Sequence, residues 1–363
     1  MDKFEARDGS LPSSSRTDIS TLWYTRCPVP TASSVAVHLG LLTREFEADG
    51  IAVRSLRASA ERGVRESHFD HSQANSFREG GNTPPLWNCA KRADIVIIGL
   101  TWVDEYQAIL ALPESGIRTV EDLRGRRVGV PVRTSDQIDF FRGMAVRGYL
   151  SAMRTVGLGR DEVEFVEIPV TESYLGDATV SNDGQLWSGG NRARRQQADA
   201  FALIRGQVDA IYTSGAAGLQ LGAFLGAHEV MEFGFHPDPE VRGGNEQPVV
   251  LSASAALVRE RPDLAARYLR QVLNAAEWAE SHREETIQLF ANEIGTSFEW
   301  ADAAYGPDVH RKLRPSLDEE LVSALDVQKA FLLEHGFLPA DFPLDSVIER
   351  TPLELALARA FTA

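Results

Sequence analysis

The chain has 363 residues, of which 43% are hydrophobic and 25% are charged, as is typical of globular proteins. Its formal net charge of −15 opposes binding to nucleic acid, which requires clustered Lys and Arg. The polar opening of the chain is unlike a secretory signal, and no run approaches ~18 apolar residues. We therefore expect a cytoplasmic protein that contacts neither nucleic acid nor a membrane.

Short β-type runs alternate with helical stretches along the first part of the chain. Residues 1–18 are rich in Ser and Asp and are predicted to be a disordered lead-in. The strand TLWYT, an amphipathic helix over 33–50 and the strand IAVRSL follow. The near-continuous apolar runs ADIVIIGL and YQAILAL indicate two buried strands. This alternation is typical of an α/β fold.

A stretch rich in proline, glycine and charge begins near residue 113 and separates a second series of elements. The series starts with the strand RRVGVPV and a helix from Asp136 to Met153, and it continues through VEFVEIP, ADAFALIRGQ and VDAIYTS. Residues 172–197 are predicted to form a long functional loop. Beyond Arg261 the pattern is almost wholly helical.

The simplest arrangement of these elements is two α/β lobes around a cleft. Lobe one would comprise residues 19–112 and 240–363, including the C-terminal helices, and lobe two residues 113–239. Clefts between lobes are a usual place for a small ligand.

The two cysteines, Cys27 and Cys89, are predicted to be free thiols, because a large intracellular protein gains little from one disulfide. Cys27 lies between the first strand and the helix that starts near Ala32. Amides at a helix N-terminus stabilise a thiolate, which is the nucleophilic form of cysteine. The competing interpretation is a buried, unreactive thiol.

A polar segment, SHFDHSQANSFREGGN, gathers side chains that could act on a thiol or an anion. A histidine can take the proton of a thiol, an arginine can bind an oxyanion, and paired glycines can present bare amides. The alternative is a solvated surface loop. The spacing of His68, Asp70 and His71 matches no known zinc site, so we predict no metal site.

Two further features have an ordinary structural interpretation. Thr134 or Ser135 is predicted to cap the following helix, and a phosphate loop is excluded because its glycine spacing is missing. Four aromatic residues could clamp a planar ligand or belong to the core: Trp87, Trp102, Trp187 and Tyr212.

The pair YTRCPVP and HFDHSQANSFREGGNTPPL resembles the 2'-hydroxybiphenyl-2-sulfinate desulfinase family of bacterial dibenzothiophene desulfurisation. The resemblance continues through DLRGRRVGV, GQVDAIY, LVRERPDL and KLRPSLDEELV, and so covers nearly the whole chain after the first ~20 residues. It implies a two-lobed, periplasmic-binding-protein-like (type II) fold with a central cleft and a helical C-terminal segment.

The resemblance also implies the site and the reaction. Three residues would be catalytic, namely Cys27 as nucleophile or acid, His68 as its partner and Arg78 as the sulfinate clamp. Three more would contact the substrate: Gly81, Gln73 and Phe69. The implied reaction is hydrolysis of the carbon–sulfur bond of an aryl sulfinate with release of sulfite. We expect a monomer that needs no cofactor or metal and whose partner is a small sulfinate-like substrate.

The chain departs from the family in two places. The segment 132–163 is shorter than the corresponding region of the family. After VDAIYTS the chain continues with GAAGLQLG, where the family carries tryptophans. The pocket is therefore predicted to differ even if the chemistry is shared. Two alternatives stay open: a non-catalytic solute-binding protein for an aromatic sulfonate-like or other small anion, and a related cysteine enzyme that acts on another acid.

Overall fold

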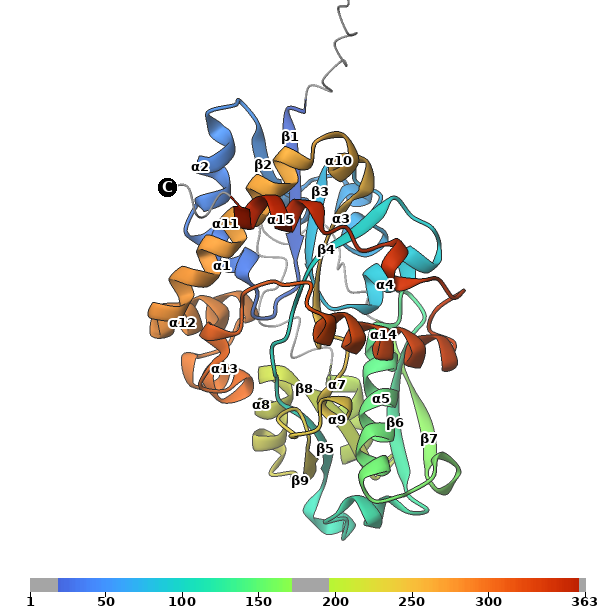
Figure 1. The fold of residues 1–363 in the computed structure, drawn as a ribbon. Coiled ribbons are helices and arrows are strands. Elements are labelled where there is room, and N and C mark those ends of the chain that lie inside the picture. The colour runs from blue at the N-terminus through green and yellow to red at the C-terminus, as the bar shows by residue number, and fades with distance from the viewer. Residues whose placement is uncertain (1–18, 172–195, 359–363) are drawn as a thin grey trace, which may run out of the picture.

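Two five-stranded sheets form the framework of the protein (Figure 1). The computed structural model describes residues 19–171 and 196–358. The predicted lead-in and all but the last two residues of the predicted loop over 172–197 lie outside the described residues. The α/β class predicted from the sequence is confirmed.

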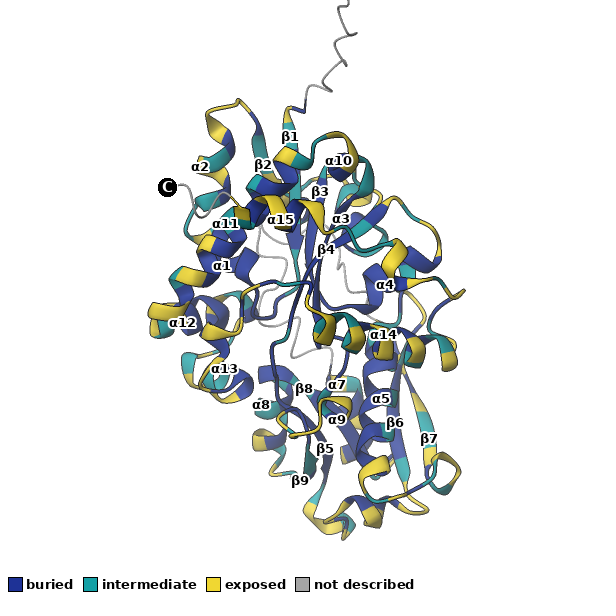
Figure 2. Ribbon diagram, in the orientation of Figure 1, coloured by how far each residue is buried: buried dark blue, intermediate teal, exposed yellow. Residues whose placement is uncertain are grey.

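The first sheet combines parallel and antiparallel pairs. β1 pairs in parallel with β2 and β3, and β10 pairs antiparallel with β3 and β4. All residues of β3 and β10 are buried (Figure 2), which suits central strands covered on both faces. In spatial order its strands are β2 (Ala52–Ser55), β1 (Thr21–Arg26), β3 (Ser76–Gly80), β10 (Val249–Ser254) and β4 (Ile95–Thr101).

The second sheet has the same size and a related pattern. β6 pairs in parallel with β7 and β8, whereas β5 pairs antiparallel with β8 and β9. In spatial order its strands are β7 (Glu164–Val170), β6 (Arg127–Arg133), β8 (Ala210–Ser214), β5 (Gln107–Ala111) and β9 (His228–Glu232).

Helices surround both sheets. Around the second sheet lie α5 (Phe140–Thr155), α7 (Gln197–Ile204), α8 (Gly215–Leu225) and α9 (Pro239–Arg242). The long helix α11 packs against α1, α2 and α15 beside the first sheet, and α14 contacts both α4 and α9. The remaining helices are α1 (Ala32–His38), α2 (Leu41–Glu47), α3 (Arg62–Asp70), α4 (Thr83–Ala90), α10 (Ala255–Glu260), α11 (Pro262–Ser281), α12 (Arg283–Ile294), α13 (Phe298–Tyr305), α14 (Glu319–Glu334) and α15 (Thr351–Ala358).

Several helix limits differ from the predictions for local reasons. The helix predicted over 33–50 is two helices, because Gly40 adopts a left-handed φ of 68° between α1 and α2. The helix predicted from Asp136 begins at Phe140, where Asp139 rather than Thr134 or Ser135 caps it by accepting from the amide of Arg142. No helix among the described residues has the length and apolar content that a membrane crossing requires.

Two segments join the sheets, residues 102–106 and residues 243–248. The first crossing comes earlier in the chain than the predicted boundary at 112, because β5 belongs to the second sheet. The limits of the two lobes stay a prediction. Gln247 donates from its side chain to the carbonyl of Val103 at 2.9 Å, so the two crossing segments are bonded to each other.

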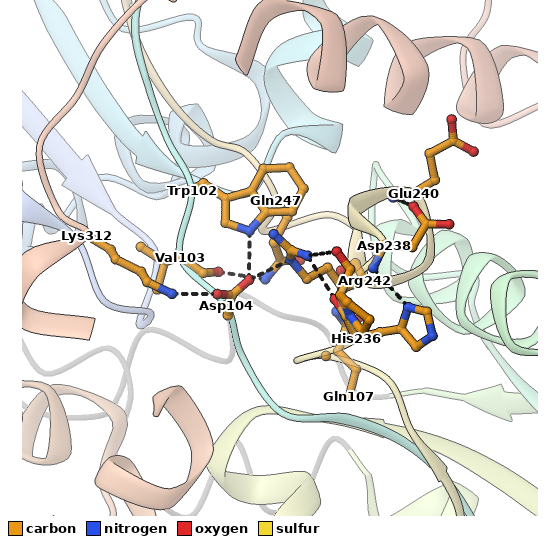
Figure 3. A network of polar contacts seen from close by, with 12 residues as sticks. Trp102, Val103, Asp104, Gln107, His236, Asp238, Glu240, Arg242, Gln247 and Lys312 are labelled. Atoms are coloured by element: carbon orange, nitrogen blue, oxygen red, sulfur yellow. Dashed lines mark hydrogen bonds and ion pairs between the residues drawn. The ribbon is translucent and has the colours of Figure 1, made fainter. Parts of the chain in front are cut away.

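One carboxylate, that of Asp104, gathers donors from three parts of the chain at this crossing (Figure 3). The indole N–H of Trp102 donates to Asp104 at 2.7 Å, Arg242 Nε at 3.0 Å and Lys312 Nζ at 2.7 Å. Arg242 ends α9, and Lys312 comes from the C-terminal part of the chain. Asp104 thus links the first crossing segment to the end of α9, directly before the second crossing segment, and to the C-terminal region.

A second polar cluster holds the C-terminal end of α3 against the first sheet. His71, with a left-handed φ of 54°, follows the last residue of α3. Its Nδ1 lies 2.9 Å from Asn88 Nδ2 and its Nε2 lies 3.3 Å from Ser252 Oγ. Asn88 also donates to the carbonyl of Phe69 at 2.6 Å. Burial, and secondly the charge of Arg78, lower the pKa of His71 to about 3.

The pKa of His71 predicts an acid-dependent loss of stability. Unfolded histidine titrates near pH 6.5, so between about pH 6.5 and pH 3 the unfolded chain binds a proton that the folded chain does not. The free energy of unfolding should therefore decrease as the pH is lowered through this window, by up to ~1.4 kcal/mol per pH unit from this group. Urea titrations from pH 7 to pH 4.5 should show a shallower slope for His71→Gln, and parallel curves would contradict the prediction. The exposed control His335→Gln should keep the slope of the wild type.

The Asp104 cluster predicts a charge-dependent loss of stability. Asp104→Asn preserves the shape of the side chain but removes the negative charge that Arg242 and Lys312 share. We expect the free energy of unfolding at neutral pH to fall by about 1–3 kcal/mol, because two cations lose their charged acceptor. Asp308→Asn, at an exposed ion pair with Arg311, should change it by less than about 1 kcal/mol. Equal effects of the two variants would show that the cluster contributes no more than a surface pair.

Candidate active site

Cys27 directly follows β1 and faces the end of β3. Its backbone N–H donates to the carbonyl of Glu79 at 2.9 Å, which continues the pairing of the two strands by one residue. The side chain is partly exposed. Cys89, in contrast, is buried in α4, and burial raises the pKa of its thiol to about 12. Only the first of the two free cysteines has the exposure that a reactive thiol needs.

The imidazole of His68 lies beside the sulfur of Cys27. His68 sits in the last turn of α3, with only 4% of its surface exposed. Its Nε2 is 3.7 Å from Cys27 Sγ, and its Nδ1 is 2.8 Å from Thr25 Oγ1. A thiol in hydrogen-bond contact with an imidazole nitrogen can transfer its proton there and become a nucleophile.

Arg78 reaches the same sulfur from the buried strand β3. Its Nη2 donates to Cys27 Sγ at 3.4 Å, while its Nε donates to the carbonyl of His68 and its Nη1 to that of Gly81, both at 3.0 Å. The guanidinium group is therefore held in place by two backbone carbonyls, one from α3 and one directly after β3. A fixed positive charge at this position can hold an anionic substrate beside the sulfur.

Two glycines after Arg78 allow the close approach of these groups. A Cβ atom on Gly80 would lie 2.3 Å from Cys27 Sγ, so any side chain there would displace the sulfur. A Cβ atom on Gly81 would lie 2.1 Å from the side-chain nitrogen of Asn245, which belongs to the second crossing segment. The predicted site is thus bordered by backbone on one side and by the crossing segment on the other.

The predicted assistance of α1 to the thiolate is wrong, because other groups occupy the helix amides. The N–H of Ser33 donates to Glu79 Oε2 at 2.8 Å, and that of Ser34 to its N-cap Thr31 at 3.2 Å. Glu79 is buried next to the helix start, and burial raises the pKa of its carboxyl group. The partial positive charge of the helix N-terminus, which would stabilise a thiolate, therefore acts on the carboxyl group of Glu79 instead.

The segment SHFDHSQANSFREGGN is not the polar loop that its composition predicts. His68 lies on a helix and Arg78 on a buried strand, and only residues 71–75 connect them. The alternative of a solvated surface loop is also wrong for these two side chains, which are 4% and 3% exposed. Spacing along the chain therefore concealed that the two side chains converge from different elements.

The two remaining predicted substrate residues lie differently. Phe69 packs edge-on against the ring of His68 at 4.7 Å between centroids, and it stacks on Phe140 of α5 at 6.4 Å. It also lines a cavity of about 200 Å³ between α3 and residues 135–138. Gln73 lies in the connection after α3, where its amide donates to the neighbouring carbonyl of Ala74 at 3.3 Å. Phe69 is therefore adjacent to the histidine, whereas no hydrogen bond joins Gln73 to Cys27.

The described aromatic residues of the predicted clamp have structural partners. Tyr212 is buried and donates to Gln107 at 2.9 Å, and Trp102 donates to Asp104. The ring of Trp87 lies under the ammonium group of Lys91 at 4.0 Å. Trp187 lies outside the described residues.

Two residues beside Cys27 and Gly81, namely Thr25 and Asn245, are not predicted by any motif of the sequence. The position of Thr25 was predictable from the period of a strand. Side chains two residues apart along a strand lie on the same face, so Thr25 is expected on the same side as Cys27. Asn245 carried no local signal, because its position beside Gly81 depends on the return of the chain from the second sheet.

Comparison with known proteins gives a consistent picture. No family model matches the chain. The 2'-hydroxybiphenyl-2-sulfinate desulfinases of Rhodococcus erythropolis and Rhodococcus qingshengii are each 29% identical to it over 352 residues, covering 90% of both chains.

Solved structures extend this similarity to the fold. A cysteine-to-serine mutant of the enzyme DSZB, solved in complex with biphenyl-2-sulfinic acid, has a TM-score of 0.74 and 28% identity, covering 93% of this chain and 99% of its own. The periplasmic aliphatic sulphonate binding protein SsuA from Escherichia coli has a TM-score of 0.63 and 15% identity, covering 91% and 92%. This chain is therefore similar over nearly its whole length to the 2'-hydroxybiphenyl-2-sulfinate desulfinases, and it has the two-lobed fold of periplasmic binding proteins.

Proposed function

We propose that this protein is a cysteine-dependent desulfinase that hydrolyses the carbon–sulfur bond of an aryl sulfinate. The overall reaction takes a sulfinate and water to the desulfinated product and hydrogen sulfite, and it needs no redox partner. The geometry at Cys27 carries the proposal, since an imidazole and a guanidinium both contact one partly exposed sulfur. The similarity to named desulfinases over 90% of the chain supports the same substrate class.

Arg78 is the proposed sulfinate clamp. Two of its five N–H bonds already donate to the carbonyls of His68 and Gly81. The Nη2 end, which points at Cys27 Sγ, is then the donor for a sulfinate oxygen. We assign the backbone amide of Gly81 to the second oxygen and the ring of Phe69 to an apolar part of the substrate. This arrangement would hold the sulfinate against the thiol.

Two chemical routes fit these positions. In the first, Cys27 attacks the sulfinate sulfur, a proton goes to carbon as the carbon–sulfur bond breaks, and water cleaves the resulting thiosulfonate-like cysteine adduct to thiol and hydrogen sulfite. In the second, the Cys27 thiol protonates the ipso carbon, sulfur dioxide leaves and adds water, and the thiolate regains its proton. His68 holds or returns the proton in both routes.

The alternative, a non-catalytic solute-binding protein, shares the fold but gives no reason for the contacts at Cys27. An anion site needs Arg78 and backbone amides, but not a thiol held between imidazole and guanidinium. We further propose that the protein acts in the cytoplasm, where reducing conditions keep Cys27 as a thiol, that it works as a monomer, and that the hydrolysis requires neither metal nor cofactor.

Sulfite release tests the proposed function directly. The purified protein is incubated with 2'-hydroxybiphenyl-2-sulfinate, biphenyl-2-sulfinate and a series of smaller aryl and alkyl sulfinates, and sulfite is quantified over time. We expect release from at least one aryl sulfinate, loss of it by ~10³-fold or more in Cys27→Ser, and normal release in Cys89→Ser. Tight binding of a sulfinate without any sulfite from the wild type would favour the binding-protein alternative.

Substitution of Arg78 by lysine tests the clamp. The three contacts of Arg78 use three different nitrogen atoms, and the one nitrogen of a lysine cannot occupy all three positions. Arg78→Lys should therefore raise KM for the sulfinate by about 10-fold or more and also lower kcat. Arg154→Lys, at an exposed arginine of α5, is the matched control and should leave both constants unchanged. An unchanged KM in Arg78→Lys would remove this side chain from substrate binding.

A further inference from the structure

Thr25 contacts the nitrogen of His68 that faces away from the cysteine. The hydroxyl oxygen of Thr25 lies 2.8 Å from Nδ1, while Nε2 of the same ring lies 3.7 Å from Cys27 Sγ. Thr25 is 1% exposed, so solvent does not compete for its hydroxyl group. The two ring nitrogens of His68 are thus both directed at residues of one short stretch of chain.

The surroundings leave the His68 ring one orientation in which both contacts form. The carbonyl of His68 is held by Arg78 Nε at 3.0 Å, and Phe69 packs edge-on against its ring. With the backbone of His68 held in this way, the orientation of its ring decides which nitrogen faces the sulfur. A flipped ring would place carbon atoms opposite Thr25 and Cys27 and would lose both hydrogen bonds.

A hydroxyl group suits this position because it can donate or accept. When Cys27 is a thiol, Nε2 can accept its proton if Nδ1 carries hydrogen and donates to Thr25. After the transfer both nitrogens carry hydrogen, and the same Nδ1–H contact to Thr25 persists. The hydroxyl oxygen of Thr25 can therefore accept from Nδ1–H both before and after the proton transfer.

We propose that Thr25 is a positioning residue for the reaction, which keeps His68 Nε2 on the sulfur of Cys27. Its consequence for turnover rests on the proposed desulfinase function, but its effect on the thiol does not. Thr25 is the partner of Arg78 in the pairing of β1 with β3, but its hydroxyl group contacts His68 and makes no hydrogen bond to Arg78 or Gly81. We therefore expect substrate affinity not to depend on that hydroxyl group. Removing the hydroxyl group should therefore slow the chemical step and spare binding.

Thr25→Val is nearly isosteric and removes only the hydrogen-bonding group, whereas Thr25→Ser retains it. We expect Thr25→Val to lower the rate of Cys27 alkylation by iodoacetamide by about 10-fold, followed by intact mass at fixed pH, and to lower kcat for sulfite release similarly with KM within about twofold. Thr25→Ser should restore both rates. Thr213→Val, at a buried strand threonine of β8, should leave both unchanged.

A double-mutant cycle separates positioning from a local packing effect. On a His68→Ala background, Thr25→Val should cause no further loss of alkylation rate, because its action passes through the imidazole. Equal loss on both backgrounds, no loss in Thr25→Val alone, or equal loss in Thr25→Ser would each overturn the proposal. If no sulfinate yields sulfite, the alkylation cycle still decides the role of Thr25, so the two proposals fail separately.

Discussion

The contact between the sulfur of Cys27 and the backbone of Gly80 is the constraint on which the site depends. Pairing of β1 with β3 brings the cysteine against the end of the neighbouring strand, and only a glycine leaves room for the sulfur there. The same pairing sets Arg78, two residues earlier in β3, within reach of the thiol. Sheet register, rather than loop conformation, therefore decides whether these groups meet.

Much of the framework was predictable from local patterns, but the convergence of the site was not. Periodicity indicated the strand before Cys27 and the helix after it, and family resemblance singled out His68 and Arg78. Composition failed at the segment that carries those two residues, because a polar helix end and a buried polar strand look like a loop in sequence. The burial of Glu79 beside the start of α1 was also not predictable from composition. Glutamate is usually exposed, and here the pairing of β3 with its neighbouring strands buries it.

The fold resembles that of periplasmic binding proteins, and the two segments that cross between the sheets are joined by side-chain hydrogen bonds to each other and to the C-terminal part of the chain. Asp104, in the first crossing segment, accepts hydrogen bonds from Arg242 at the end of α9 and from Lys312 in the C-terminal part of the chain. In addition, α14 contacts both α4 and α9. Such a region favours one mutual orientation of the two sheets. A catalytic site gains from this, because reacting groups must keep their distances through many turnovers.

The insertion of the second sheet between β4 and β10 also affects how the protein must fold. Asn245 bonds to the amide of Thr83 across 162 residues of sequence, and β10 completes the sheet beside β3 only after the chain has returned. Contacts of such high sequence separation form late and slowly. A nascent chain that has already produced Cys27, His68 and Arg78 would therefore lack Asn245 beside Gly81. The surroundings of the thiol that we propose to react would stay incomplete until more than two thirds of the protein had been synthesised.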